Sequence, residues 1–498
     1  MRTKLAILKL MALAGAALPA LIAPTEARIT RIEITAEEPA FAGKVFGNTG
    51  SYVKLFGRAY GEVDPGLPQN AIIQDISLAP KNARGRVEYV TDIAILKPAD
   101  LAKGNGVQIV EVHNRGRKLI INSFNDKVAG NQEAINNLNE AGDGFLMEQG
   151  YTLVWFGWQA DVAPGDGRMT LDVPVAKNSD GSPITGPVRT ELTTLAPTKT
   201  LNLSSGWFTG MITKSYPTAS IDNRTATSDG FLPKLTVRSR EQEPRVEIAN
   251  TEWSFGNCAD GSAVRVNDTQ ICMPGGFQPG KLYELIYRAK DPLVLGLGFA
   301  AARDIGAFIK TRVKDDAGKP NPAYRAGSKA IILGTSQSGR MIRTMLHLGF
   351  NRGEDGARVY EGAYPHIGGG MMSMNIRFAQ PGRAWGDQID HLYPAYDFPF
   401  TYARQTDPLT GRTQGVLDRC IETNTCPRIF HVATALEIWE GRQSLGLTDP
   451  LGKRDIADPP NVRTFIMAST QHSPAALPLP VQPPFGVCQQ QGNPNPQR

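Results

Sequence analysis

The spacing of apolar positions changes along the chain, and each change predicts a different kind of structure. Residues 28–100 carry short apolar alternations, for example at Ile29 and Ile32, which turn signals interrupt. This pattern predicts a β-rich segment. From about residue 105, compact apolar runs alternate with helix-like stretches. Residues 165–280 return to short β-like pieces with many turns, which predicts an insertion or a second lobe.

The compact apolar runs are nearly continuous, as expected for strands that are buried on both faces. A helix-like stretch rich in Leu, Ala and Phe lies between residues 292 and 309. Strands that alternate with helices predict a mainly parallel sheet covered on both faces. The predicted strands are residues 107–112, 151–156, 329–333, 428–432 and 462–467.

These patterns divide the chain into segments with different expected structures. The last segment is rich in Pro, Gln and Asn, which predicts an irregular tail. The segments are a leader at residues 1–27, a β-rich N-terminal segment at 28–104, an α/β domain at 105–477 with an insertion at about 165–280 and a lid-like segment at about 367–427, and the tail at 478–498.

The leader has the features of a signal peptide. Three basic residues accompany an apolar stretch at residues 10–22, and Thr25 and Ala27 are small residues at the two positions that a signal peptidase reads. The alternative is a membrane anchor, but the apolar stretch is short for a span. We therefore expect cleavage after Ala27 and a secreted or periplasmic protein that is not held at a membrane.

The overall charge gives no sign of a nucleic-acid partner. The net charge of +5 becomes +3 without the leader, because the leader carries three positive charges and one negative charge. Both signs are mixed along the chain, whereas a nucleic-acid binder usually carries a clustered basic face. We expect a small-molecule partner instead, and no feature of the sequence predicts an oligomeric state.

The five cysteines are consistent with export. Cys258 and Cys272 lie close together in a Gly-, Asp- and Asn-rich stretch, and Cys420 and Cys426 lie beside a predicted strand. We predict two local disulfides, which leave Cys488 without a partner. A zinc site is the alternative, but the spacing lacks CxxC pairs and no histidine clusters with these cysteines.

The strongest motif is Gly334-Thr-Ser-Gln-Ser-Gly-Arg340. It follows a predicted strand and precedes apolar positions at helical spacing, which is the setting that a nucleophile elbow requires. The residues two before and two after the nucleophile must be small. Gly334 and Ser338 satisfy this around Ser336, whereas Arg340 is too large for Ser338 to qualify. Ser336 is therefore the candidate nucleophile, and the Gln337 amide is a candidate oxyanion donor.

A histidine on a loop after a later strand would serve as the base. Among six histidines, His472 is the last and follows the strand at 462–467. The alternatives are His366 as a residue that lines the site, His391 in the lid-like segment, and His431, whose place within a predicted strand favours a core role. Position therefore favours His472.

The acid is expected between the serine and the histidine in the chain, after a strand. Glu437 closely follows the strand at 428–432 and would orient the imidazole. Glu440 lies deeper in a predicted helix, and Asp449 precedes a proline in a predicted turn. Glu437 is therefore the preferred acid, and a solvated surface carboxylate remains the alternative for it.

A second oxyanion donor normally comes from the loop after an earlier strand. Here the loop His113-Asn-Arg-Gly116 occupies that place. The backbone amides of Asn114 and Arg115 are both candidates. The Arg115 side chain has two alternatives, a structural ion pair or contact with a substrate carboxylate, and we favour the ion pair.

Taken together, these motifs resemble the bacterial proteins grouped as "alpha/beta hydrolase domain" proteins, over residues 29–490 approximately. The resemblance implies an α/β-hydrolase fold and the triad Ser336, Glu437 and His472. The elbow alone is similar to those of tannase/feruloyl-type and glucuronoyl esterases, which have the form G-x-S-x-x-G. The resemblance is based on residues 61–65, 114–116, 334–340, 437–439 and 468–472.

The predicted activity is hydrolysis of a carboxylic ester through an acyl-enzyme. Amidase, peptidase or lactonase action would use the same residues. A non-catalytic binding protein on a hydrolase scaffold is the alternative from another class. The presence of all three triad residue types argues against this alternative, and the longer chain past the histidine in the resembling family argues weakly for it. The chain has no HExxH motif, no P-loop and no GxGxxG after a strand, so we expect neither a metal nor an organic cofactor.

Overall fold

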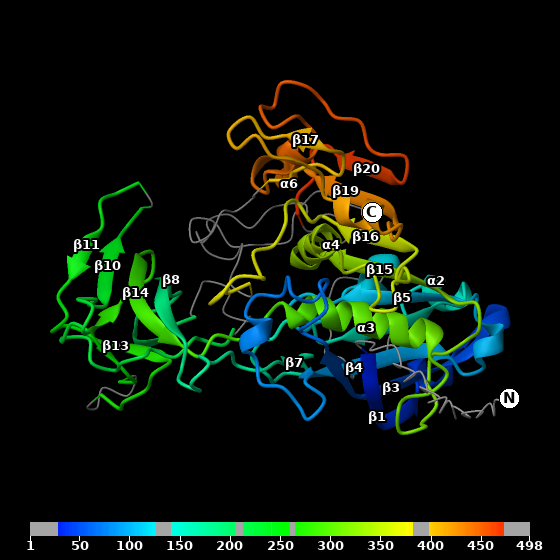
Figure 1. The fold of residues 1–498 in the computed structure, drawn as a ribbon, viewed down its shortest axis with the longest axis horizontal. Coiled ribbons are helices and arrows are strands. Elements are labelled where there is room, and N and C mark those ends of the chain that lie inside the picture. Colours follow the sequence, from blue (N-terminus) through cyan, green and yellow to red (C-terminus); the bar gives the residue numbers. More distant parts are fainter. Residues whose placement is uncertain are drawn as a thin grey trace, which may run out of the picture.

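The computed structural model describes residues 28–125, 141–204, 213–240, 242–258, 264–381 and 398–472. The predicted leader, the tail, His391 and Cys488 lie outside these residues, as does part of the predicted lid-like segment. The described chain forms a large lobe built on one long twisted sheet and a smaller β lobe beside it (Figure 1).

The sheet of the large lobe has 11 strands and changes from antiparallel to parallel along its width. The strands from β1 to β6 pair antiparallel, and those from β6 to β20 pair parallel. In spatial order they are β1 (Arg28–Pro39), β3 (Gly50–Val63), β4 (Val87–Pro98), β6 (Thr152–Phe156), β5 (Val107–Val112), β15 (Lys329–Thr335), β16 (Gly362–His366), β19 (Arg428–Thr434) and β20 (Val462–Met467), with β2 (Val45–Phe46) beside β3 and β7 (Leu171–Asp172) beside β4.

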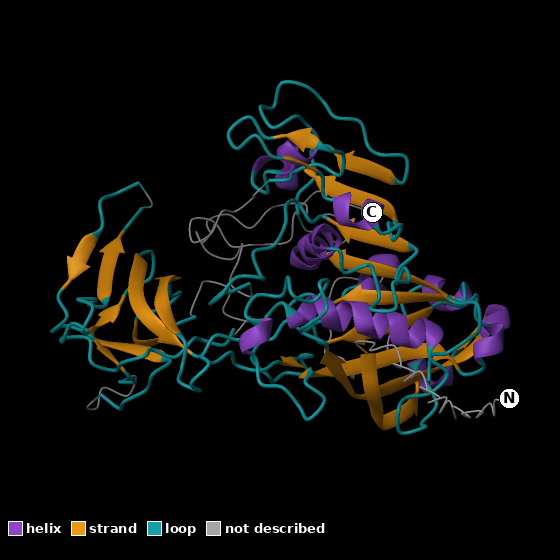
Figure 2. Ribbon diagram, in the orientation of Figure 1, coloured by secondary structure: helices purple, strands orange, loops and turns teal. Residues whose placement is uncertain are grey.

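Helices cover both faces of this sheet (Figure 2). On one face, α3 and α4 bury apolar side chains in the largest core, and α3 is buried at every position from Leu297 to Gly306. On the other face, α1 and α2 lie over a second core that includes Trp155 and Leu333. The helices are α1 (Ile120–Phe124), α2 (Phe145–Glu148), α3 (Leu297–Thr311), α4 (Gln337–Leu348), α5 (Asp418–Glu422) and α6 (Ala435–Trp439).

The apolar pattern predicted this arrangement, and the fold class is confirmed: a mixed central sheet, parallel in the half that contains the candidate site, with a β-rich N-terminal region. The central strand β6 is buried at every residue, which explains its continuous apolar run. Short connections complete the lobe. They include η1 (Phe41–Gly43), η2 (Gly47–Thr49), η3 (Ile76–Leu78), η4 (Leu101–Lys103), η6 (Gln443–Gly446) and the hairpin of β17 (Gln405–Thr406) and β18 (Thr413–Gln414).

The small lobe contains a four-stranded and a three-stranded antiparallel sheet, which enclose an aromatic core of their own. It contacts the large lobe where the Tyr216 hydroxyl donates to the Ala379 carbonyl at 3.0 Å and the Tyr216 ring meets Phe378 edge-on. Its strands are β8 (Thr185–Leu192), β9 (Thr198–Asn202), β10 (Lys234–Arg238), β11 (Val246–Ile248), β12 (Ser254–Phe255), β13 (Gln270–Phe277) and β14 (Leu282–Lys290).

Both predicted disulfides are present. Cys258 and Cys272 join β13 to the chain after β12 in the small lobe, and Cys420 and Cys426 join α5 to the chain that follows it in the large lobe. Disulfides persist in oxidising compartments and are rare in the cytosol. Among the residues that the structure describes, no helix is both long and apolar enough to cross a membrane.

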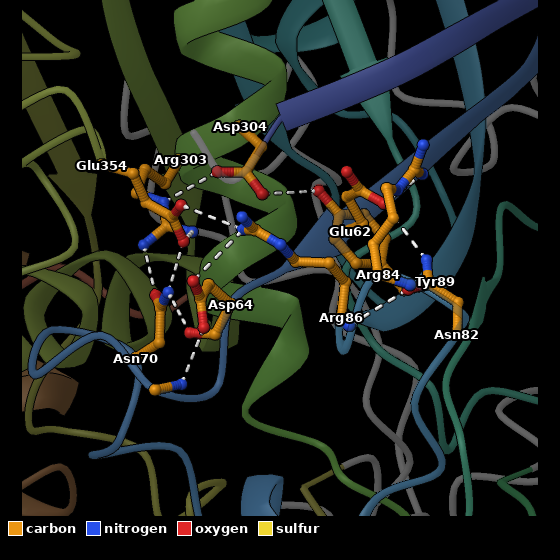
Figure 3. Close-up of polar contacts among 11 residues, drawn as sticks. Glu62, Asp64, Asn70, Asn82, Arg84, Arg86, Tyr89, Arg303, Asp304 and Glu354 are labelled. Carbon is orange, nitrogen blue, oxygen red and sulfur yellow. Dashed lines mark hydrogen bonds and ion pairs between the residues drawn. The ribbon is translucent and has the colours of Figure 1, made fainter. Parts of the chain in front are cut away.

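A buried polar network ties the N-terminal region to α3 (Figure 3). Arg303 donates to Asp304 and to Asn70, each at 2.7 Å, and lies 3.6 Å from Glu354. Tyr89, on β4, donates to the other oxygen of Asp304 at 2.9 Å. Arg303 and Asp304 are almost fully buried and so lose their hydration. The hydrogen bonds and ion pairs with these partners compensate for that loss.

Candidate active site

Ser336 lies at a sharp turn between β15 and α4. Its backbone has φ 62° and ψ −120°, a conformation that non-glycine residues rarely adopt. A Cβ on Gly334 would lie 2.6 Å from the Ser338 carbonyl oxygen, so a larger residue at 334 would collide with the first turn of α4. The tight turn therefore explains the small residues that the motif contains.

Two further contacts hold the turn against neighbouring strands. The Ser336 amide donates to the His366 carbonyl at the end of β16, at 2.8 Å. The buried Ser338 hydroxyl donates to the His113 carbonyl after β5, also at 2.8 Å. Ser338 is thus a packing residue of the elbow, and the Ser336 side chain is the one left for chemistry.

His472 follows the last strand of the sheet and reaches Ser336. Its Nε2 lies 2.6 Å from the Ser336 Oγ. A quarter of the His472 side chain remains exposed. At this distance His472 Nε2 can form a hydrogen bond with the Ser336 hydroxyl, as a base that takes the serine proton must.

Glu437 approaches the other nitrogen of this imidazole. Its Oε1 contacts His472 Nδ1, and its Oε2 accepts hydrogen bonds from the amide and the hydroxyl of Thr434. Burial alone would raise the pKa of Glu437, but the His472 and Thr434 contacts together hold that pKa below its ordinary value. The carboxylate is therefore ionised and able to orient the ring and stabilise its charged form.

Thr434 is a residue of this site that sequence reasoning missed. It precedes α6, and Glu437 occupies the third helical position, so the pair forms a capping box. The T-x-x-E spacing at the start of a short helix was the signal that could have found it. The same interaction that begins α6 thereby fixes one oxygen of Glu437 and leaves the other for His472.

The rival acids lie elsewhere. Glu440 is exposed at the end of α6. Asp449 accepts hydrogen bonds from the Lys453 amide and the Arg454 side chain, within a turn. Glu437 is the carboxylate that contacts His472.

Two other described histidines are held in neutral form. His431 is fully buried in β19, where Nδ1 meets the Tyr402 hydroxyl at 3.0 Å, and burial holds its pKa well below the ordinary value. His366 contacts the Tyr364 hydroxyl, and burial lowers its pKa to about 4 even though Glu437 is near enough to oppose this shift. His366 therefore lies beside the site as an uncharged neighbour.

The candidate oxyanion donors meet at the elbow. The Gln337 amide begins α4, where the helix dipole favours negative charge. The Asn114 side chain donates to the Thr335 carbonyl at 3.2 Å, which fixes the loop after β5 beside Ser336. The Asn114 amide donates to the Arg117 carbonyl at 3.0 Å within this loop, and Arg115 is the next residue along it. The Arg115 side chain contacts the Asn114 side chain at 3.1 Å.

Within the described ranges, no group of three or more His, Cys, Asp or Glu side chains is arranged to hold a metal ion.

The arrangement of sheet, elbow and later connections defines the class of protein: this is an α/β-hydrolase fold. The serine lies at the elbow, the histidine lies on the loop after β20, and the carboxylate lies in the first turn of α6 after β19. Residues 261–498 match the family described as "Alpha/beta hydrolase domain".

Other comparisons add little. Among solved structures, the glucuronoyl esterase from Solibacter usitatus matches with 9% identity over 88% of this chain and 81% of that chain. Its TM-score of 0.28 is too low to bear on activity or substrate. No curated protein matches the chain significantly.

Proposed function

We propose that this protein is a serine hydrolase that cleaves carboxylic esters of small molecules, with Ser336 as nucleophile, His472 as base and Glu437 as the orienting acid. The observation that carries this proposal is the continuous contact from Ser336 Oγ through His472 to Glu437. The strained backbone at Ser336 supports it as well, since such strain clusters at functional sites.

In the first half of the reaction, Ser336 Oγ bonds to the ester carbonyl carbon while its proton passes to His472 Nε2. The amides of Gln337 and Arg115 would stabilise the oxyanion. His472 then gives the proton to the departing alkoxide, which leaves an acyl-enzyme. In the second half, water attacks the acyl carbon and passes a proton to His472. His472 returns this proton to Ser336 Oγ as the bond between Oγ and the acyl carbon breaks, which releases the acid and free Ser336.

The test is covalent labelling of the purified protein with a fluorophosphonate probe. We expect the parent protein to be labelled and Ser336→Ala to remain unlabelled. Glu437→Gln should lower kcat on p-nitrophenyl acetate by roughly 10³-fold or more, because the imidazole loses its orienting charge. A folded parent protein that takes no label would overturn the proposal and favour a binding role.

A panel of matched substrates separates the related activities. An ester, a lactone and an amide with the same acyl group would be compared by kcat/KM. We expect the ester to be preferred, because its alkoxide leaves more readily than an amine. Preference for the amide would replace esterase with amidase action by the same residues.

We also propose that the protein works outside the cytoplasm. The two disulfides in the folded chain support this location. Fractionation of expressing cells, with N-terminal sequencing of the product, should find the protein in the periplasm or medium and beginning after Ala27. Recovery of uncleaved protein in the cytoplasm would contradict this.

A further inference from the structure

The loop between β5 and α1, residues 113–119, is held against the elbow at its first residues. The His113 carbonyl accepts hydrogen bonds from the Trp158 indole at 2.7 Å and from the Ser338 hydroxyl at 2.8 Å. His113 Nδ1 accepts the Gly116 amide at 3.0 Å. These contacts fix the start of the loop, but none of them fixes its return toward α1.

A buried carboxylate holds the other end of this loop. Glu111 is 1% exposed and lies on β5, between Val110 and Val112. Its Oε1 accepts the Leu119 amide at 2.8 Å, and its Oε2 accepts the Ile120 amide at 3.2 Å. Contacts therefore hold the loop that carries Arg115 at both of its ends, and Glu111 provides those at the end next to α1.

A third donor comes from the neighbouring strand. The Trp155 indole, on β6, donates to Glu111 Oε2. Lys118, in the loop itself, is the charged group that acts on the carboxylate, and its ammonium lies 5.1 Å from the Trp155 ring. All three hydrogen-bond partners of Glu111 are N–H donors. They suit an ionised carboxylate, because its oxygens only accept hydrogen bonds.

We infer that Glu111 is a positioning residue for this site: its ionised carboxylate fixes the loop of residues 113–119 so that the Arg115 amide faces the carbonyl oxygen of a substrate bound at Ser336. This inference rests on the proposed function. Glu111 acts through the loop and does not itself contact the reacting atoms.

The ionisation state of Glu111 makes the inference specific. Burial raises its pKa to about 7, although the Trp155, Leu119 and Ile120 donors and Lys118 oppose the shift. When pH falls below this value the carboxyl gains a proton, and one oxygen then presents an O–H to an N–H donor. The contact between Glu111 and the loop then weakens. The Arg115 amide therefore loses its position at the proposed site as pH falls.

The experiment compares rates of fluorophosphonate labelling and p-nitrophenyl acetate hydrolysis across pH. Glu111→Gln mimics the protonated form, since its NH₂ group faces a donor. We expect labelling and kcat to fall roughly 10- to 100-fold with little change in KM, since small misalignments have effects of this size. The rate should also fall less steeply with decreasing pH than in the parent. Glu148→Gln, an exposed carboxylate on α2, serves as the matched control with parental rates.

A second variant keeps the inference testable if Glu111→Gln does not fold. Trp155→Phe removes one donor that lowers the pKa of Glu111, so the acid-side fall in rate should move to higher pH. Parental rates and pH profiles in both folded variants would overturn the inference while leaving the proposed function intact. Absence of labelling in the parent protein would instead overturn the proposed function.

Discussion

At the scale of single residues, the described histidines differ in how much of each is exposed to water. His113 and His431 are fully buried neutral groups and His366 is a half-buried neutral group, whereas His472 is partly exposed and contacts a carboxylate. An imidazole that must gain and lose a proton in each cycle needs such a partner and access to water. The difference supports His472 as the proposed base.

His113 makes stability depend on pH. Burial lowers its pKa to about 3 in the folded protein, whereas an unfolded histidine titrates near 6.5. The unfolded chain therefore binds the proton first as pH falls, and the free energy of unfolding declines below about pH 6.5.

We predict that the free energy of unfolding declines less steeply with falling pH in His113→Asn, whose side-chain oxygen can accept a hydrogen bond from the Gly116 amide. The difference should approach about 1.4 kcal/mol per pH unit between about pH 6 and 4, the contribution of one proton. Urea unfolding at a series of pH values measures it. Near neutral pH the two slopes should coincide, and identical slopes at acid pH would contradict the assignment.

At the scale of elements, the strand–turn–helix around Ser336 was predictable, because helical and strand periodicities meet at one short motif. The preference for Glu437 and His472 came from their order along the chain. What the sequence did not reveal depends on tertiary contact. The bond from the Asn114 amide to Arg117 requires Arg115 and Gly116 to take positive φ, and no local pattern indicated that for an arginine. The partners of Glu111 come from the end of the loop of residues 113–119, from the first residue of α1 and from β6, although an acid inside an apolar strand was itself a signal.

The small lobe depends on its own cross-link. The disulfide between Cys258 and Cys272 spans 14 residues, and closing a loop of this size stabilises a fold by about 3 kcal/mol in the chain-entropy model. We predict that the double variant Cys258→Ala, Cys272→Ala becomes sensitive to limited proteolysis within residues 185–290. Mass spectrometry of the first fragments locates the cleavage.

The control is the double variant Cys420→Ala, Cys426→Ala, which removes the large-lobe disulfide. It should leave the small lobe as resistant as in the parent protein. Equal resistance of all three proteins would show that the aromatic core alone holds the small lobe together.

At the scale of the whole molecule, the network around Arg303 joins regions far apart in sequence. Asn70 comes from the β3–β4 connection, Asp304 from α3, and Glu354 from the connection after α4. The N-terminal region is thus bonded to the α/β core through buried charge as well as through the sheet (Figure 3).

We predict that Arg303→Met destabilises the protein by about 3–5 kcal/mol, since Asp304 would then remain buried without its cation and Glu354 would keep only its longer pair with Arg86. Arg312→Met is the matched control, because the pair of Arg312 with Asp316 is partly exposed and is worth about 1 kcal/mol or less. Urea unfolding of the three proteins gives the comparison. A loss from Arg303→Met as small as the control's would contradict the importance of the network.

Among the residues that the structure describes, the strand before His472 is the last one at its side of the sheet. β20 pairs with β19 at the end of the strand order, and within it only Val462 is buried. Edge elements with few buried residues open at low free energy, well before the molecule melts. If His472 is the base, warming should abolish turnover while the central strands still protect their amides from hydrogen exchange. Heat inactivation would then reflect local opening of β20 and not unfolding of the whole protein. Cooling should restore activity without refolding of the core.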